Sequence, residues 1–280
     1  MHFMQDAFAH CAELVRTADR DRYLAALFAP AQHRDALFAL YAFNVEVGRV
    51  REVAREALPG EIRLQWWREV LSGERGGEAK ANPVAAALLH SIERYRLAAD
   101  KLTELIEARR FDLYDEPMAG IAVVEAYAKA TSSTVIGLAA QILGVDAEPA
   151  AQPAGIAYGI TRLLRAFPLH AARHQLYVPT ALLERHGVDA HEIFAGQSSP
   201  GLNAALAELR SLAHCHLAAT REPLMALPRA VHPAFLSVAL VRPWLDRSDH
   251  CDAFEPTVIS PWRRQWLIWR AARNPVRIAG

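Results

Sequence analysis

The stretch LFALYAFNVEVGRVRE, residues 37–52, indicates the fold of this chain more clearly than any other segment. Five of its residues recur at spacings of three and four, the period of one helix face. They are Leu37, Leu40, Tyr41, Asn44 and Gly48. We therefore predict a helix over 31–52 with one face lining a pocket. The end of this helix carries Arg49 and Arg51 where other helices of this kind carry acidic groups.

Composition limits the classes of function. The chain has 280 residues, 52% of them hydrophobic, enough to bury a sizeable core. Lys and Arg number 31 and so do Asp and Glu, so the basic excess of a nucleic-acid binder is missing. Cys11, Cys215 and Cys251 form no CxxC pair, which argues against a disulfide framework or a zinc site. We expect no nucleic-acid partner and a reducing compartment.

The start of the sequence lacks the basic and apolar regions of a secretion signal. The sequence also lacks a run of about 18 apolar residues, so we expect no transmembrane helix. These features predict a cytoplasmic protein, with peripheral attachment to the inner (cytoplasmic) membrane as the alternative.

Almost every periodic segment indicates a helix, and no strand alternation is evident. The expected helices are 6–28, 31–52, 61–72, 83–97, 99–111, 121–143, 153–167, 180–187, 203–226 and 231–245. SGERGGEAK (72–80) and GVDAEPAAQP (144–153) are expected to be a loop and a linker. The pattern predicts an all-α domain over 1–260, followed by a basic tail over 261–280.

A second pocket-lining helix is predicted within GIAYGITRLLRAFPLHAARHQLYVP, residues 155–179. Tyr158, Arg162 and Ala166 are four residues apart, so they share one helix face with Arg165 beside them.

Pro168 is expected to end this helix at Phe167, because proline lacks an N–H and disfavours helical geometry in the residue before it. His170 and His174 would then lie in a loop or a distorted turn.

These stretches resemble the squalene/phytoene synthase family, whose members join two prenyl diphosphates head to head. The segment 37–52 is similar to the one that carries the family's first aspartate-rich motif, and 159–179 is similar to the second. ARRFDLYDEP (108–117) and VVEAYAKATSSTVIGLAAQILG (123–144) are similar to helices between them. The resemblance implies an all-α isoprenoid-synthase bundle around a central cavity.

The resemblance also implies Mg²⁺ ligands that this sequence lacks. The family has Asp at 48, 49, 52, 166 and 170, and these carboxylates hold the ions that bridge to the substrate diphosphate. The chain instead has Gly48, Arg49, Glu52, Ala166 and His170. We therefore expect no catalytic residue, no metal ligand and no cofactor, with Mg²⁺ needed only if the chain is an active enzyme.

The pocket itself is expected to persist, because its lining residues match helix periodicity or family positions. The candidate ligand-binding residues are Arg34, Tyr41, Asn44, Gly48, Arg49, Glu52, Asp112, Tyr127, Tyr158, Arg162, Arg165 and Tyr177.

A narrower resemblance is to a degenerate, non-catalytic subgroup found in mitochondrial complex I assembly. It is carried by AFNVE (42–46), by LRAFPLH (164–170) and by the spacing of Arg63, Gln65 and Trp67. The resemblance implies assembly intermediates of respiratory complex I as partners, a peripheral membrane surface and a prenyl diphosphate or another prenyl lipid as a further ligand.

The arginines of the predicted pocket allow two interpretations. Arg49, Arg51, Arg162 and Arg165 could hold a diphosphate or a phospholipid head directly, without a metal. Alternatively, they are solvated or pair with the carboxylates nearby. Glu46 and Glu52 could likewise act as acid and base or form ion pairs. His170 and His174 are spaced for a metal pair, but no acidic third ligand is near.

The last segment, PWRRQWLIWRAARNPVRIAG (261–280), contains five arginines and no acidic residue. Its tryptophans, at spacings of four and three, share one helix face, which is typical of a helix at a membrane interface. Docking on the protein itself or on a partner is the alternative. The candidate contact residues are Trp262, Arg263, Trp266, Trp269 and Arg270.

Three functions remain. The first is a non-catalytic assembly or interaction factor for complex I that also binds a prenyl lipid. The second is an active head-to-head prenyltransferase acting on prenyl diphosphates. The third is a lipid carrier whose cavity holds a prenyl or quinone tail.

Overall fold

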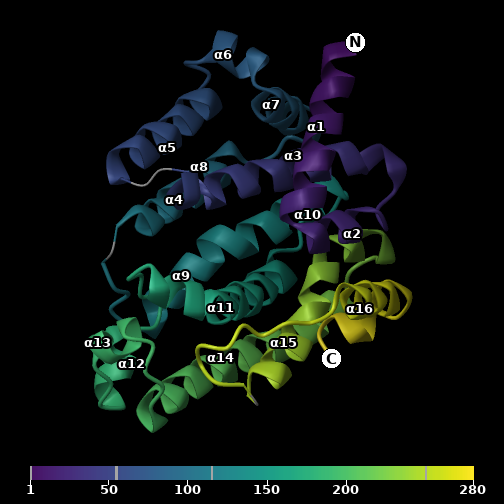
Figure 1. Cartoon of the computed structure of the whole chain (residues 1–280). Coiled ribbons are helices and arrows are strands. Elements are labelled where there is room, and N and C mark those ends of the chain that lie inside the picture. The colour runs from purple at the N-terminus through teal and green to yellow at the C-terminus, as the bar shows by residue number, and fades with distance from the viewer. Residues whose placement is uncertain (1, 54–55, 115, 250) are drawn as a thin grey trace. The chain divides into compact units, whose positions relative to one another are not determined.

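The computed structural model describes residues 2–53, 56–114, 116–249 and 251–280, and within these ranges every regular element is helical (Figure 1). The predicted all-α fold is confirmed. The chain forms two compact units. The first comprises Met1–Tyr114, Thr134–Glu148 and Leu227–Ser237. The second comprises Asp115–Ser133, Pro149–Ala226 and Val238–Gly280.

The first unit is built around a buried central helix. Its helices are α1 (His2–Ala18), α2 (Arg20–Ala26), α3 (Ala31–Gly48), α4 (Val50–Val53), α5 (Ala57–Ser72), α6 (Gly76–Ala81), α7 (Pro83–Tyr95), α8 (Ala99–Arg109) and α10 (Thr134–Ile142), with 3₁₀ turns η1 (Arg110–Leu113) and η3 (Arg229–Leu240). α3 is buried at every position from Ala36 to Val45 and packs against α1, α7 and α10. A helix that is apolar all round must be covered all round.

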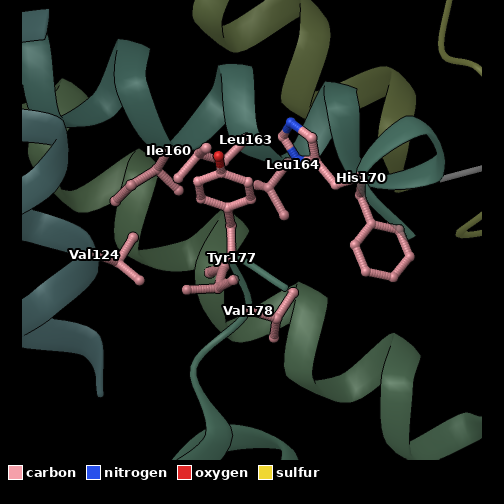
Figure 2. Close-up of a pocket in the computed structure, with 9 residues that line it drawn as sticks. Val124, Ile160, Leu163, Leu164, His170, Tyr177 and Val178 are labelled. Carbon is pink, nitrogen blue, oxygen red and sulfur yellow. The ribbon is translucent and has the colours of Figure 1, made fainter. Parts of the chain in front are cut away.

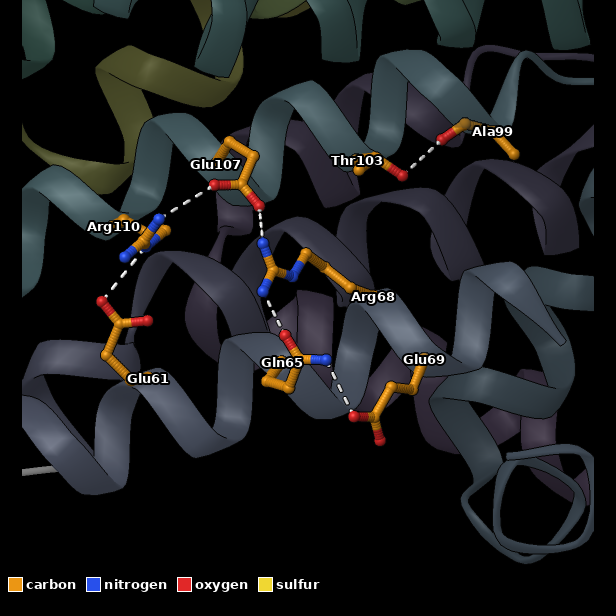
Figure 3. Close-up of polar contacts among 8 residues, drawn as sticks. All are labelled: Glu61, Gln65, Arg68, Glu69, Ala99, Thr103, Glu107 and Arg110. Atoms are coloured by element: carbon orange, nitrogen blue, oxygen red, sulfur yellow. Dashed lines mark hydrogen bonds and ion pairs between the residues drawn. The ribbon is translucent and has the colours of Figure 1, made fainter. Parts of the chain in front are cut away.

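Polar groups join α5 to α8 at the surface of the first unit (Figure 3). Arg110 bonds to Glu61 at 3.1 Å and to Glu107 at 3.4 Å. Arg68 bridges Glu107 and Gln65. Each pair is partly exposed, so the network fixes the register of the two helices more than it stabilises them.

The second unit contains α9 (Ile121–Ala128), a π-helical turn η2 (Lys129–Ser133), α11 (Glu148–Ala172), α12 (Thr180–Arg185), α13 (Ala190–Phe194), α14 (Pro200–Met225), α15 (Val241–Ser248), α16 (Pro261–Arg273) and a 3₁₀ turn η4 (Pro275–Ile278). α11 lies very close to the α9–η2 segment. A Cβ on Gly155 would overlap the backbone of Ser133, and one on Gly159 would stand 2.7 Å from the Cβ of Ala128. Glycine is therefore required at both positions.

Several predicted boundaries are wrong. The helix predicted over 31–52 ends at Gly48, because Arg49 leaves helical geometry with φ −102° and ψ 9°. The predicted loop 72–80 is helical from Gly76, since Ala79 is fully buried and anchors α6.

α11 is longer than predicted at both ends. It begins at Glu148, within the predicted linker 144–153, and it continues through Pro168 to Ala172. Pro168 removes the hydrogen bond to the carbonyl of Leu164, and its ring crowds that carbonyl. Packing outweighs that loss, because Phe167 and Ala171 are both buried.

None of the helices described is both long enough and apolar enough to cross a bilayer.

Candidate functional site

Charged groups lie at the end of α3, the helix for which the sequence predicts a pocket-lining face. The N–H of Arg49 bonds to the carbonyl of Val45 at 3.1 Å and closes α3, and α4 starts at once. Arg49 and Glu52 then form an ion pair, with Nε and Oε2 3.5 Å apart and both side chains about half exposed. The structure thus gives Glu52 and Arg49 the structural pairing that was one of the two interpretations of the sequence.

A buried guanidinium lies against Gly48. A Cβ at position 48 would stand 3.6 Å from Nη2 and 3.7 Å from Cζ of Arg109. Arg109 also donates to the carboxylate of Asp112 at 3.1 Å, and both side chains are less than one-tenth exposed. This places a fixed positive charge beside position 48, where the family resemblance implies a carboxylate.

Two further charged residues near the end of α3 have partners within the first unit. Arg51 donates to the backbone carbonyl of Leu113 at 2.8 Å and so ties α4 to η1. Glu46 accepts from Arg63 at 3.3 Å. These contacts give Arg51 and Glu46 structural roles.

Three pocket candidates lie along α3. Arg34 donates to the carbonyl of Ala29 at 2.8 Å and braces the turn before the helix. Tyr41 is buried, with the guanidinium of Arg22 5.6 Å from its ring centre. Asn44 is 4% exposed, and its Oδ1 has no hydrogen-bond partner among the residues that the structure describes. A buried acceptor of this kind is costly unless water or a ligand satisfies it.

The pocket candidates on α11, in the second unit, do not share one environment. Tyr158 is buried, whereas Arg162, one turn later, is exposed. Arg165 stacks on Trp244 of α15, with its Cζ 3.7 Å from the ring centre. This contact is a cation–π interaction, which holds the guanidinium flat against the indole.

An aromatic cluster joins the end of α11 to the segment that follows it. The ring centres of His170 and Tyr177 are 4.4 Å apart, and those of Tyr127 and Tyr177 are 5.9 Å apart. His170 belongs to the last turn of α11, not to a loop, while His174 lies beyond the helix with a positive φ of 56°. The helical spacing expected of a histidine metal pair is therefore lost.

This cluster borders an apolar pocket of the second unit (Figure 2). It is lined by Val124, Ile160, Leu163, Leu164, Phe167, His170, Tyr177, Val178 and Leu209. Its free volume is about 10 Å³, comparable to that needed by one water molecule. The lining side chains would have to move to admit a prenyl tail.

The residues at the motif positions do not fit Mg²⁺, which prefers carboxylate oxygens and phosphate in octahedral geometry. In the first unit, the carboxylate at the motif positions is that of Glu52, and it is already paired with Arg49. A side chain at position 48 would lie beside the guanidinium of Arg109. In the second unit, Ala166 and His170 supply no oxygen. Across the described part of the chain, no three His, Cys, Asp or Glu side chains are placed to hold a metal ion.

Two important groups escaped the sequence analysis. Arg109 lies within the quoted stretch ARRFDLYDEP (108–117) but was given no role there, although its i,i+3 spacing from Asp112 signals an ion pair. Trp244 gave no such signal, because its stacking partner Arg165 is remote in sequence.

Comparison with known proteins gives relatives of two kinds. A sequence model described as squalene/phytoene synthase matches residues 15–270. Complex I assembly factor 6 of Rattus norvegicus is 30% identical over 93% of this chain and 84% of its own length. Phytoene synthase of Thermus thermophilus is 28% identical over 92% of this chain and 91% of its own length.

Solved structures show the same fold. A dehydrosqualene synthase solved with a ligand superimposes with a TM-score of 0.81 at 18% identity, over 96% of each chain. The match of the family model to most of the sequence and the 30% identity to a full-length relative agree with this fold. The chain belongs to the squalene/phytoene synthase family.

Proposed function

We propose that this protein is a non-catalytic member of the family that acts in the assembly of respiratory complex I. The observation that carries the first half is the position of the Arg109 guanidinium, 3.6 Å from where a Cβ at position 48 would stand, next to the Arg49–Glu52 ion pair. Both aspartate-rich motifs are then lost, and the charge developing on a departing diphosphate has no metal to neutralise it.

The assembly role rests on the relatives. Complex I assembly factors from several animals align with this chain over most of its length. The sequence features that suggested this subgroup include AFNVE (42–46), which lies in the last third of α3. Because the resemblance to this subgroup implies a peripheral membrane surface, we also propose that the protein acts at the inner (cytoplasmic) membrane.

A prenyl-lipid ligand is compatible with this role but requires the apolar pocket of the second unit to open. His170 and Tyr177, whose ring centres are 4.4 Å apart, are the polar side chains that line this pocket. The protein would bind such a ligand without converting it, and this binding needs no cofactor.

The competing function is an active head-to-head prenyltransferase, favoured by the phytoene synthase relatives. Incubation of the purified protein with farnesyl or geranylgeranyl diphosphate and Mg²⁺ distinguishes the two. We expect diphosphate release at the background rate. Release that depends on Mg²⁺ and disappears in Glu52→Gln would establish the enzyme instead.

The assembly role is tested by deleting the gene in the organism that encodes it. Membranes of the deletion strain should contain less assembled complex I and show lower NADH:quinone oxidoreductase activity. The Glu52→Gln variant should restore both to the level of the unchanged gene, because no carboxylate chemistry is required. Normal complex I in the deletion strain would contradict the assembly role.

A further inference from the structure

The outer face of α16 exposes three tryptophans. Trp262, Trp266 and Trp269 are 81%, 49% and 44% exposed, while Ile268 and Ala271 on the opposite side are buried. At about 100° per residue, the three indoles fall within an arc of about 60°. Exposed indoles gathered on one helix face are uncommon in a soluble surface and mark a contact site.

The same helix is positively charged. Residues 261–280 contain five arginines and no acidic residue. Arg270 lies over the ring of Trp266 at 4.2 Å, and Arg273 lies over Trp269 at 4.5 Å. These stacked guanidinium groups keep their charge and are held beside the indoles, so apolar and cationic groups occupy one face.

A basic groove adjoins α16 on the second unit. Arg242, Arg270 and Arg277 contribute to its lining, and its free volume is about 120 Å³. Asp246 is the acidic residue of this lining, and it pairs with Arg242 at 3.8 Å. The remaining positive charge suits a phosphate group, which guanidinium binds with paired hydrogen bonds.

We propose that the outer face of α16 docks on an anionic phospholipid bilayer, with the indoles in the interface and lipid phosphates at the arginines. The 13 residues of α16 span only about 20 Å, so the helix lies along the surface. Tryptophan beside arginine on a helix that has no acidic residue of its own favours a lipid surface, whereas a protein partner would be expected to meet mixed charge. Ser260 caps the helix and Pro261 starts it, so α16 is formed before it meets the lipid.

Flotation of the full chain with phosphatidylglycerol or phosphatidylcholine vesicles tests this proposal and does not depend on the assembly role. We expect binding to phosphatidylglycerol that weakens as salt is raised, and much weaker binding to phosphatidylcholine. Bromine-labelled lipid should quench tryptophan fluorescence, because the three α16 indoles are exposed, whereas Trp67 and Trp244 are buried and Trp66 on α5 is only partly exposed.

Two variants with matched controls locate the contact. The double variant Trp262→Ala/Trp266→Ala should lose at least about tenfold in vesicle affinity. Leu58→Ala/Ile62→Ala, on an equally exposed stretch of α5, should bind as the unchanged chain. Arg270→Gln should weaken binding about fivefold, the equivalent of about 1 kcal/mol. Arg221→Gln, an exposed arginine on α14, is its control.

Three results would overturn the proposal. They are no binding to phosphatidylglycerol by the full chain, equal binding to the two lipids, and unchanged binding by the tryptophan double variant. Circular dichroism of each variant shows whether the helical fold is kept, so a loss of binding is not mistaken for unfolding.

Discussion

Nη2 of Arg109 lies 3.6 Å from the point that a Cβ at position 48 would occupy, so the two positions are in van der Waals contact. The family resemblance implies a metal-binding carboxylate at this position. Here it would face a guanidinium that is buried and already held by Asp112.

Gly48→Asp tests this relationship. The new side chain fits without displacing backbone and pairs with Arg109, which offsets the unfavourable charge at the end of α3. We expect the free energy of unfolding to change by less than about 1 kcal/mol, because replacing a glycine within a helix stabilises the helix by a similarly small amount. Titration with Mg²⁺ should give no binding heat. Binding of Mg²⁺ by this single variant would show that Arg109 does not control the site.

The buried ion pair itself gives a second prediction. Arg109→Met removes one partner and leaves the carboxylate of Asp112 buried and less well compensated. Breaking a buried pair in this way costs about 3–5 kcal/mol. Arg49→Met is the matched control, because its pair with Glu52 is half exposed and contributes about 0–1 kcal/mol. Urea unfolding of the three proteins measures both values. Equal losses in the two variants would contradict the assignment of Arg109 as a structural cation.

The contrast between Arg49 and Arg109 shows what the sequence could and could not predict. The period of residues 37–48 was sufficient to predict a helix with a pocket-lining face, but its burial at every position from Ala36 to Val45 was not predicted. The break at Arg49 was not predictable from that period, because an arginine is compatible with a helix. Arg109 was missed because its role depends on packing between α3 and α8, which local spacing does not report.

The end of α11 shows the same limit. A rule about proline predicted that the helix stops at Phe167, yet it continues to Ala172. The local cost is one hydrogen bond and the crowding of the Leu164 carbonyl by the proline ring, and the helix continues because Phe167 and Ala171 are buried. The candidate residues on this helix were correctly assigned to one helix, but Tyr158 is buried and Arg162 is exposed because the packing of α11 varies along its length.

The contact of α11 with η2 gives a third prediction. Gly155→Ala places a methyl group on the backbone of Ser133, which cannot move without disturbing the bond from its Oγ to the carbonyl of Gln152. Overpacking of this kind costs about 1–3 kcal/mol. Gly77→Ala in α6 is the control, since a Cβ there meets no atom within 4 Å. It should be neutral or stabilising by up to about 1 kcal/mol. Thermal unfolding compares the two, and a neutral Gly155→Ala would contradict the close approach.

A fourth prediction concerns the pH dependence of stability. Burial, and to a lesser extent the negative charges of Glu46 and Asp35, raise the pKa of the Cys11 thiol from 9.0 to about 12. Cys11 is fully buried in α1. The neutral thiol is thus favoured by the folded protein, whereas the unfolded chain can lose the proton near pH 9.

The sign follows from this difference. Below pH 9 the thiol is neutral in both states, so its contribution to stability is fully present. As the pH rises from 9 toward 12, only the unfolded chain gains by ionising, and stability falls. At pH 10 the loss is about 1.4 kcal/mol, one pKa unit of differential ionisation. Urea unfolding at pH 8 and pH 10 measures it, with Cys11→Ala as the control that lacks the thiol. The unchanged chain should lose about 1.4 kcal/mol more than the variant between the two pH values. If both proteins lose the same amount, Cys11 ionises as readily in the folded state as in the unfolded chain, and its burial in α1 is not maintained in solution.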